Sequence, residues 1–197
     1  MINEDLLFSF GAELKTFDAD DVIFSEGETP SYYYYIKEGK IKLNNYSENG
    51  KEFIQGIISK EKGFGESFLF TGKNYPVNAV TIEESEILRL PKQNYINFLQ
   101  SKPDNIWSLL GCFSEHLHYK FLMMQSMAFQ SPSHKIITLL DYLKDSYGDK
   151  DPFSMPVLLT RQQLASLTGL SVETVIRVIK LMEKNQTLQI RNRKIYY

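Results

Sequence analysis

Four charged residues near the end of the chain recur at spacings of three and four: Glu173, Arg177, Lys180 and Lys184. At about 100° per residue, these side chains fall on one face of a helix. Arginine can donate to guanine O6 and N7, glutamate accepts from cytosine N4, and lysine neutralises phosphate charge. The row therefore predicts a helix that reads base edges in the major groove of DNA, with Ser171 and Thr174 adding phosphate contacts.

The opposite face of the same segment is apolar. Its members follow the i, i+3, i+4, i+7 spacing of a buried stripe: Val175, Val178, Ile179 and Met182. An ordinary solvated helix is the alternative, because Glu173 and Arg177 also have the spacing of an intrahelical ion pair. The neighbouring elements decide between the two interpretations.

Short polar residues mark where those elements begin and end. Thr160 and Gln163 are spaced as a capping box, which starts a helix over the following residues. Gly169 tolerates the positive φ at which that helix stops and turns. Ser171 then caps the second helix, which carries the charged row.

The residues after the second helix have the pattern of a hairpin. Two short apolar runs, 188–190 and 195–197, flank a basic tip that comprises Arg191, Asn192, Arg193 and Lys194. A capped helix, a glycine turn, a second capped helix and a hairpin are independent local signals. Their combination predicts a winged helix-turn-helix and makes the solvated helix the weaker interpretation.

At these residues the sequence resembles the Crp/Fnr family of bacterial transcription regulators. The resemblance is carried by residues 160–162, by the turn at Gly169 and by the run 172–177. It places the base-reading glutamate and arginine of the family on Glu173 and Arg177. It implies a homodimer that binds a pseudo-palindromic operator in double-stranded DNA, with RNA polymerase as a further partner.

Two departures from the family bear on the operator. The cyclic-AMP receptor subgroup has a further arginine at the position of Val172, and the Fnr-like subgroup has a serine at the position of Ile176. The identity of the operator is therefore open. The predicted DNA-binding residues are Thr160, Arg161, Gln162, Ser171, Glu173, Thr174, Arg177, Lys180, Lys184, Arg191 and Arg193.

The composition limits the class of protein. The length of 197 residues and the hydrophobic content of 43% suit one or two domains with real cores. The acidic start and the lack of an apolar run of about 18 residues lead us to expect a cytoplasmic protein with no membrane insertion. A single cysteine, Cys112, excludes an internal disulfide and an iron–sulfur cluster, which needs about four thiolates.

Charge is distributed unevenly along the chain. Residues 1–131 carry 12 lysines and arginines against 18 acidic residues, whereas residues 132–197 carry 10 against 6. The two parts therefore have net charges of −6 and +4. A basic part attracts polyanions, so nucleic acid should be met by the C-terminal part.

The first half of the chain has the pattern of short strands. Apolar runs broken by glycine, asparagine and proline occupy 22–24, 32–39, 41–46, 52–58, 78–82 and 86–90. This spacing is typical of an all-β sandwich or barrel, and Asn49-Gly50 is the strongest hairpin signal. In the tyrosine run 32–35, alternation places two rings inward and two outward, and a core role is favoured over a base-stacking platform.

Two stretches of this half, 27–39 and 63–68, resemble the cyclic-nucleotide-binding β-roll of the same family. The resemblance places the ribose site at Gly65-Glu66, and the Arg-Ser/Thr step that holds the phosphate in the family is Pro76-Val77 here. Proline has no N–H donor and valine has no hydroxyl, whereas a buried phosphate needs charge-assisted hydrogen bonds. We therefore expect no control by cyclic AMP.

The base-binding position also departs from the family. An ungapped match places Lys120 and Phe121 where cyclic-AMP receptors have hydroxyl residues. The candidate site for an unidentified small-molecule effector consists of Gly65, Glu66, Ser67 and Lys120.

From Lys92 onward the apolar period becomes that of helices. Residues 93–100 suit a short helix, and Pro103 begins a long one with an apolar seam that comprises Ile106, Leu110, Phe113, Leu117, Phe121, Met124 and Ala128. A seam of about three heptads favours a partner helix, most simply from a second subunit, over packing on the chain's own β-domain alone. Pro132 breaks this helix, and 134–147 predicts the next one.

We predict an α+β protein with three parts. They are a β-roll, jelly-roll-like sensor domain over 1–100, a dimerisation helix over 101–130 and a winged helix-turn-helix over 131–197. Two alternatives stay open: a cyclic-nucleotide-responsive regulator with a non-standard phosphate site, and an interaction module that does not bind DNA.

Enzymatic activity, cofactors and metals are not expected. A metal-dependent cupin needs several histidines on its strands, and residues 1–115 contain none. A phosphate loop of the form G-x-x-x-x-G-K followed by Ser or Thr is incomplete around 72–74. The three histidines, His116, His118 and His134, are interpreted as surface residues.

Overall fold

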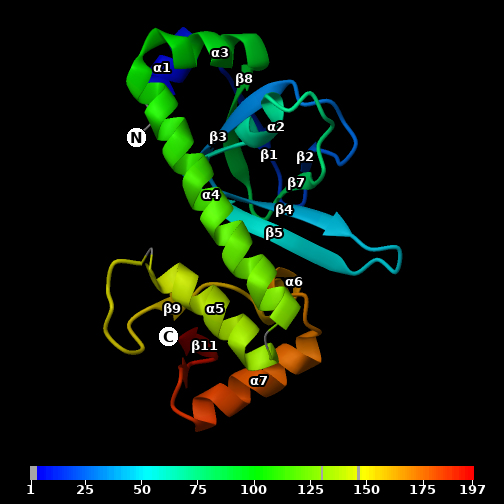
Figure 1. Cartoon of the computed structure of the whole chain (residues 1–197), viewed down its shortest axis with the longest axis vertical. Coiled ribbons are helices and arrows are strands. Elements are labelled where there is room, and N and C mark those ends of the chain that lie inside the picture. The colour runs from blue at the N-terminus through cyan, green and yellow to red at the C-terminus, as the bar shows by residue number, and fades with distance from the viewer. Residues whose placement is uncertain (1–3, 130, 146) are drawn as a thin grey trace. The chain divides into compact units, whose positions relative to one another are not determined.

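The structure is a computed structural model that describes residues 4–129, 131–145 and 147–197. The chain divides into two compact units, Met1–Phe113 and Ser114–Tyr197, and each is described by itself (Figure 1). The predicted fold class is confirmed, because an antiparallel β-domain comes first, a long helix follows and a helix-turn-helix ends the chain. Of the helices in these described ranges, none has both the length and the apolar composition that a bilayer span requires.

The first unit is built on two antiparallel four-stranded sheets. One has the order β1-β8-β3-β6 and consists of Glu13–Phe17, Ser85–Pro91, Tyr32–Glu38 and Gly63–Phe64. The other has the order β2-β7-β4-β5 and consists of Val22–Phe24, Asn78–Thr81, Lys40–Tyr46 and Glu52–Ser59. The predicted strands are all present, whereas β1 and β6 were not predicted.

The hairpin predicted at Asn49-Gly50 is confirmed and joins β4 to β5. Gly50 has a φ of 74°, a conformation that glycine adopts without steric cost. Its amide donates to the Ser47 carbonyl at 2.8 Å, and the Ser47 amide donates to the Lys51 carbonyl at 3.0 Å. These bonds close the turn and fix the register of the two strands.

Both faces of β3 are buried in the first unit. Tyr34 and Ile36 pack in one cluster with Phe24, Phe64 and Tyr75. Tyr33 and Tyr35 pack in a second cluster with Leu7 of α1 (Glu4–Ser9) and with Tyr95, Phe98 and Leu99 of α3 (Lys92–Ser101). The predicted alternation of the tyrosines is correct, but the outward pair is also buried, because α1 and α3 lie together over that face (Figure 1).

Three further helices lie in the described ranges ahead of the helix-turn-helix. The short α2 (Glu66–Leu69) follows β6. The long α4 (Pro103–Phe129) begins at the predicted proline, and α5 (Pro132–Asp145) begins at the predicted break. The predicted end of the α5 segment includes residue 146, which lies outside the described residues.

The second unit contains α5, α6 (Arg161–Thr168), α7 (Val172–Lys184) and a three-stranded sheet. The sheet has the order β10-β11-β9 and consists of Gln189–Arg191, Lys194–Tyr196 and Pro156–Val157. Helix α5 contacts both α6 and α7. Strand β9 was not predicted; it forms because Val157 pairs with Ile195, far along the chain.

Candidate nucleic-acid interface

Helix α6 starts at the predicted capping box. The Thr160 hydroxyl accepts from the Gln163 amide at 3.1 Å, and the Gln163 side-chain oxygen accepts from the Thr160 amide at 2.9 Å. The helix ends at Gly169, which has a φ of 69°. Thr160 and Gln162 are exposed at the start of the helix, and Arg161 is half-buried beside them.

Ser171 caps the N-terminus of α7, as predicted. The Ser171 hydroxyl oxygen accepts from the Thr174 amide at 3.2 Å and lies 3.0 Å from the Thr174 hydroxyl oxygen. Both predicted phosphate ligands therefore lie in the first turn, where amide groups and the helix dipole favour an anion.

The inner face of α7 is the predicted apolar stripe. Val175, Val178, Ile179 and Met182 are all at most 6% exposed. Burying side chains of this size contributes about 1.5–3 kcal/mol each. The stripe thus fixes which face of α7 remains available to a partner.

The outer face of α7 carries the predicted charged row. Glu173, Arg177, Lys180 and Lys184 are all exposed. Within the part of the chain that the structure describes, Glu173 and Arg177 do not form the ion pair that their spacing permits. Both side chains are therefore available for base edges. Ile176, also on this side, is 41% exposed.

The predicted hairpin is present as β10 and β11, one residue shifted from the expected runs. Its two-residue turn consists of Asn192 and Arg193, with φ angles of 50° and 64°. Positive φ at both central residues is the mark of a type I′ turn, which suits the twist of a hairpin. Arg191 and Arg193 are both exposed on it.

Sequence reasoning missed the residues that hold Arg191. Its Nε donates to the Gln189 side-chain oxygen at 2.9 Å, Nη2 donates to the same oxygen, and the guanidinium lies 5.1 Å from the centre of the Tyr196 ring. The strand period of two places Gln189 and Arg191 on one face. The alternation in the sequence could therefore have indicated that Gln189 supports Arg191. The contact between Arg191 and Tyr196 depends instead on the register of the two strands.

Three of the four candidate effector residues lie together where β6 passes into α2. Gly65 has a φ of 83°, and a Cβ atom there would lie 3.0 Å from the Tyr34 ring. Glu66 is 2% exposed, and its Oε1 accepts from the Ser67 hydroxyl at 3.1 Å. The fourth candidate, Lys120, lies on α4 within the second unit.

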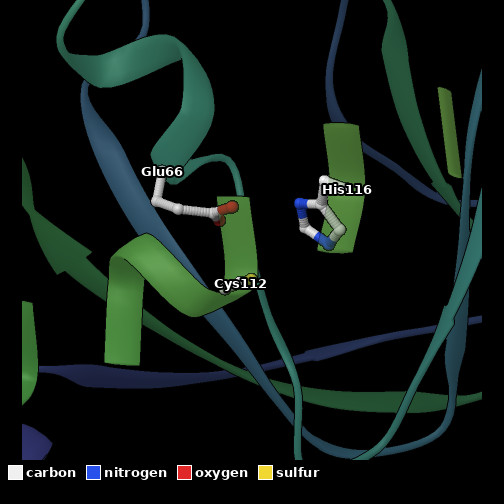
Figure 2. A group of neighbouring side chains, drawn as sticks. All are labelled: Glu66, Cys112 and His116. Carbon is white, nitrogen blue, oxygen red and sulfur yellow. The ribbon is translucent and has the colours of Figure 1, made fainter. Parts of the chain in front are cut away.

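Glu66 and Cys112 are neighbours in the first unit. Figure 2 shows the Glu66 carboxylate directed towards Cys112 on α4. Burial, with a smaller contribution from the Glu66 charge, raises the pKa of the Cys112 thiol to about 11. The thiol is therefore protonated at neutral pH. His116 follows one turn later on α4 and is half-buried, so its interpretation as a surface residue is wrong, whereas His118 and His134 are exposed as expected.

Pro76 and Val77, which correspond to the phosphate-binding Arg-Ser/Thr pair of the family, are apolar. Val77 is 5% exposed and packs in the aromatic cluster of the first unit. The preceding Tyr75 stacks on Phe24 with ring centres 3.7 Å apart. Pro76 is exposed, and its carbonyl accepts from the Asn45 amide group at 2.8 Å. This step offers a phosphate no charged donor.

Two capped helices, a buried stripe under an exposed polar row and an adjoining basic hairpin define a winged helix-turn-helix, a class of DNA-binding proteins. Comparison with known families agrees with that class. The Crp-like helix-turn-helix domain matches residues 134–197, and the cyclic nucleotide-binding domain matches residues 14–102.

Two relatives match this chain over most of their own length. The chain is 25% identical over 184 residues to the cAMP-activated global transcriptional regulator CRP of Haemophilus influenzae, covering 92% of this chain and 82% of that protein. It is 22% identical over 191 residues to the global nitrogen regulator of a Nostoc species, covering 95% and 86%. This chain belongs to the Crp/Fnr family, whose members are DNA-binding transcription regulators rather than enzymes.

The fold agrees with this family. The structure of CLP, a c-di-GMP-responsive global regulator of Xanthomonas campestris, is similar with a TM-score of 0.78 at 19% identity, covering 98% of each chain.

Proposed function

We propose that this chain regulates transcription as a homodimer on a pseudo-palindromic operator, without control by cyclic AMP. The observation that carries the proposal is the outer face of α7, where Glu173 and Arg177 are exposed and unpaired with each other above a buried stripe. In the major groove, Arg177 donates to a guanine and Glu173 accepts from a cytosine. Thr160, Ser171, Lys184 and Arg191 contact phosphates and set the register.

The proposed dimer uses α4 (Pro103–Phe129), which lies within the predicted dimerisation segment 101–130. Large apolar residues of the predicted seam are exposed in the single chain: Ile106 43%, Leu110 47%, Leu117 57%, Phe121 64% and Met124 60%. A row of this size in water favours a partner surface, and a heptad spacing suits an identical helix. A second copy of α4 is therefore the occupant that the spacing supports.

The β-roll over residues 1–100 is proposed as a sensor-like domain whose effector is not a cyclic nucleotide. The buried Val77 and the stacked Tyr75 leave the phosphate position apolar, and a phosphate in such surroundings is costly. The residues 131–197 form the DNA-binding domain in this assignment. RNA polymerase is the further partner through which such a regulator acts.

The test is selection of bound duplexes from a random pool by the full-length chain, followed by sedimentation of the complex. We expect inverted half-sites whose centres are about 34 Å apart, bound by two chains. A double variant, Glu173→Ala with Arg177→Ala, keeps the buried stripe and serves as the control that should lose selectivity. Enrichment of single asymmetric half-sites would refute the dimer, and no enrichment at all would favour the interaction module that does not bind DNA.

A further inference from the structure

The tip of the wing holds an arginine in a backbone conformation that disfavours it. Arg193 has a φ of 64°, and Asn192 before it has a φ of 50°. The Cβ atom of any L-residue crowds the following carbonyl oxygen there, but the short polar side chain of asparagine can offset this cost with a local hydrogen bond, whereas the long arginine side chain does not. Glycine is the residue that the second position of a type I′ turn favours. The backbone at Arg193 is therefore strained.

This strain is not offset by an ion pair or a side-chain hydrogen bond of Arg193 within the described residues. The side chain is exposed, and it forms none of the ion pairs or side-chain hydrogen bonds found in residues 4–129, 131–145 and 147–197. Arg191 differs, because Gln189 and Tyr196 hold its guanidinium on the strand. A strained residue with no internal partner points to an external one.

We propose that Arg193 inserts into the minor groove beside each half-site and selects flanks that are rich in A·T pairs. This inference rests on the proposed function of α7. A·T-rich segments have a narrow minor groove with enhanced negative potential, which attracts arginine. The guanine amino group obstructs that groove in G·C pairs. Arg193 therefore reads groove width and potential rather than a single base.

A simple phosphate contact does not account for arginine at this position. Arg191 and Lys194 already place positive charge on the same hairpin, and neither has a positive φ. A phosphate can be reached from such unstrained positions by any flexible cation. Insertion into a groove instead requires a long cation at the extreme end of the hairpin, which is the position that the left-handed turn creates.

The test uses full-length protein and duplexes with one fixed operator core, flanked on the wing side by A·T, G·C or inosine·C pairs. Inosine·C pairs keep the major-groove pattern of G·C but lack the amino group in the minor groove. For the unmodified chain we expect A·T and inosine·C flanks to bind about 5–10-fold more tightly than G·C flanks. Arg193→Gly should abolish this difference while the preference for the core over a scrambled core persists.

Calorimetry provides a second measurement that separates recognition from folding. Arg193→Gly relieves the left-handed arginine and should raise the Tm by about 2–6 °C, although it weakens binding to A·T flanks. A merely structural arginine would lower the Tm on removal. The matched control Lys194→Ala removes one charge at an unstrained neighbour and should weaken all three duplexes alike.

Each outcome has one meaning. Equal affinity of the unmodified chain for all flanks, or a flank preference that survives Arg193→Gly, overturns the minor-groove assignment. Failure to prefer the core over a scrambled core overturns the proposed function of α7 instead.

Discussion

Arg177 and Lys184 lie on the same exposed face of α7 but near opposite ends of its charged row. Recognition helices contact base edges mainly through their N-terminal residues. Arg177→Ala should therefore cost roughly 1–3 kcal/mol on the selected operator and relax selectivity at one base pair. Lys184→Ala should weaken binding to selected and random duplexes alike. It should also reduce the slope of log affinity against log salt concentration by about 1, which corresponds to the loss of one phosphate contact.

Fluorescence anisotropy titrations on selected and random duplexes, repeated at several salt concentrations, measure both effects. Equal losses on the two duplexes for Arg177→Ala would mean that Arg177 contacts phosphate and that another residue reads the base. Lys180→Ala extends the comparison, because Lys180 lies between the two on the same face.

At the scale of elements, the start of α6 depends on the reciprocal pair Thr160 and Gln163. Thr160→Ala leaves the Gln163 amide without its capping oxygen and should lower the free energy of unfolding by about 1 kcal/mol. Thr160→Ser keeps the hydroxyl and should be close to neutral. Urea unfolding of the two variants checks this difference, and equal stability of Thr160→Ala and the unmodified chain would contradict it.

The exposed seam of α4 predicts the state of association. Leu117→Glu and Phe121→Glu place charges where side chains of the unmodified chain are 57% and 64% exposed. Burying an unpaired carboxylate in a helix pair is costly, so we expect both variants to be monomers that keep their helical content. His118→Glu is the matched control, because His118 is exposed on α4 outside the predicted seam.

Sedimentation equilibrium measures the molecular mass, and circular dichroism measures the helical content. Dimers of unchanged affinity in both seam variants would show that α4 is not the dimer interface. Loss of dimers in His118→Glu as well would show that a charge anywhere on α4 disrupts the dimer. The seam would then not be specifically required for association.

At the scale of the whole molecule, a ligand bound by the sensor domain would act by changing the affinity for the operator. Cyclic AMP and cyclic GMP at millimolar concentration should neither bind nor improve operator affinity, because Val77 offers no donor to the phosphate and is buried among apolar groups. Calorimetric titration with each nucleotide, followed by operator binding in its presence, tests this. A saturable heat with micromolar affinity would show that other donors replace the arginine that the family has at Pro76, such as backbone amides or the exposed Lys73 three residues earlier. It would restore the interpretation as a cyclic-nucleotide receptor.

The amino-acid sequence by itself determined the helix-turn-helix. Its capping box, glycine turn and buried stripe depend on residues within about four positions of each other, so the boundaries at Thr160, Gly169 and Ser171 were predicted and are found. The hairpin of β4 and β5 was predicted for the same reason, since its turn is encoded by adjacent residues.

Only the tertiary structure decided what covers each face and which distant residues pair. Tyr33 and Tyr35 are buried because α1 and α3 pack on them, and α1 has only six residues, too few for a periodic signal. Strand β9 exists because Val157 meets Ile195. Tyr196 supports Arg191 through the register of the wing. Such contacts depend on chain segments that are far apart in sequence, and a pattern within one segment does not specify its partner.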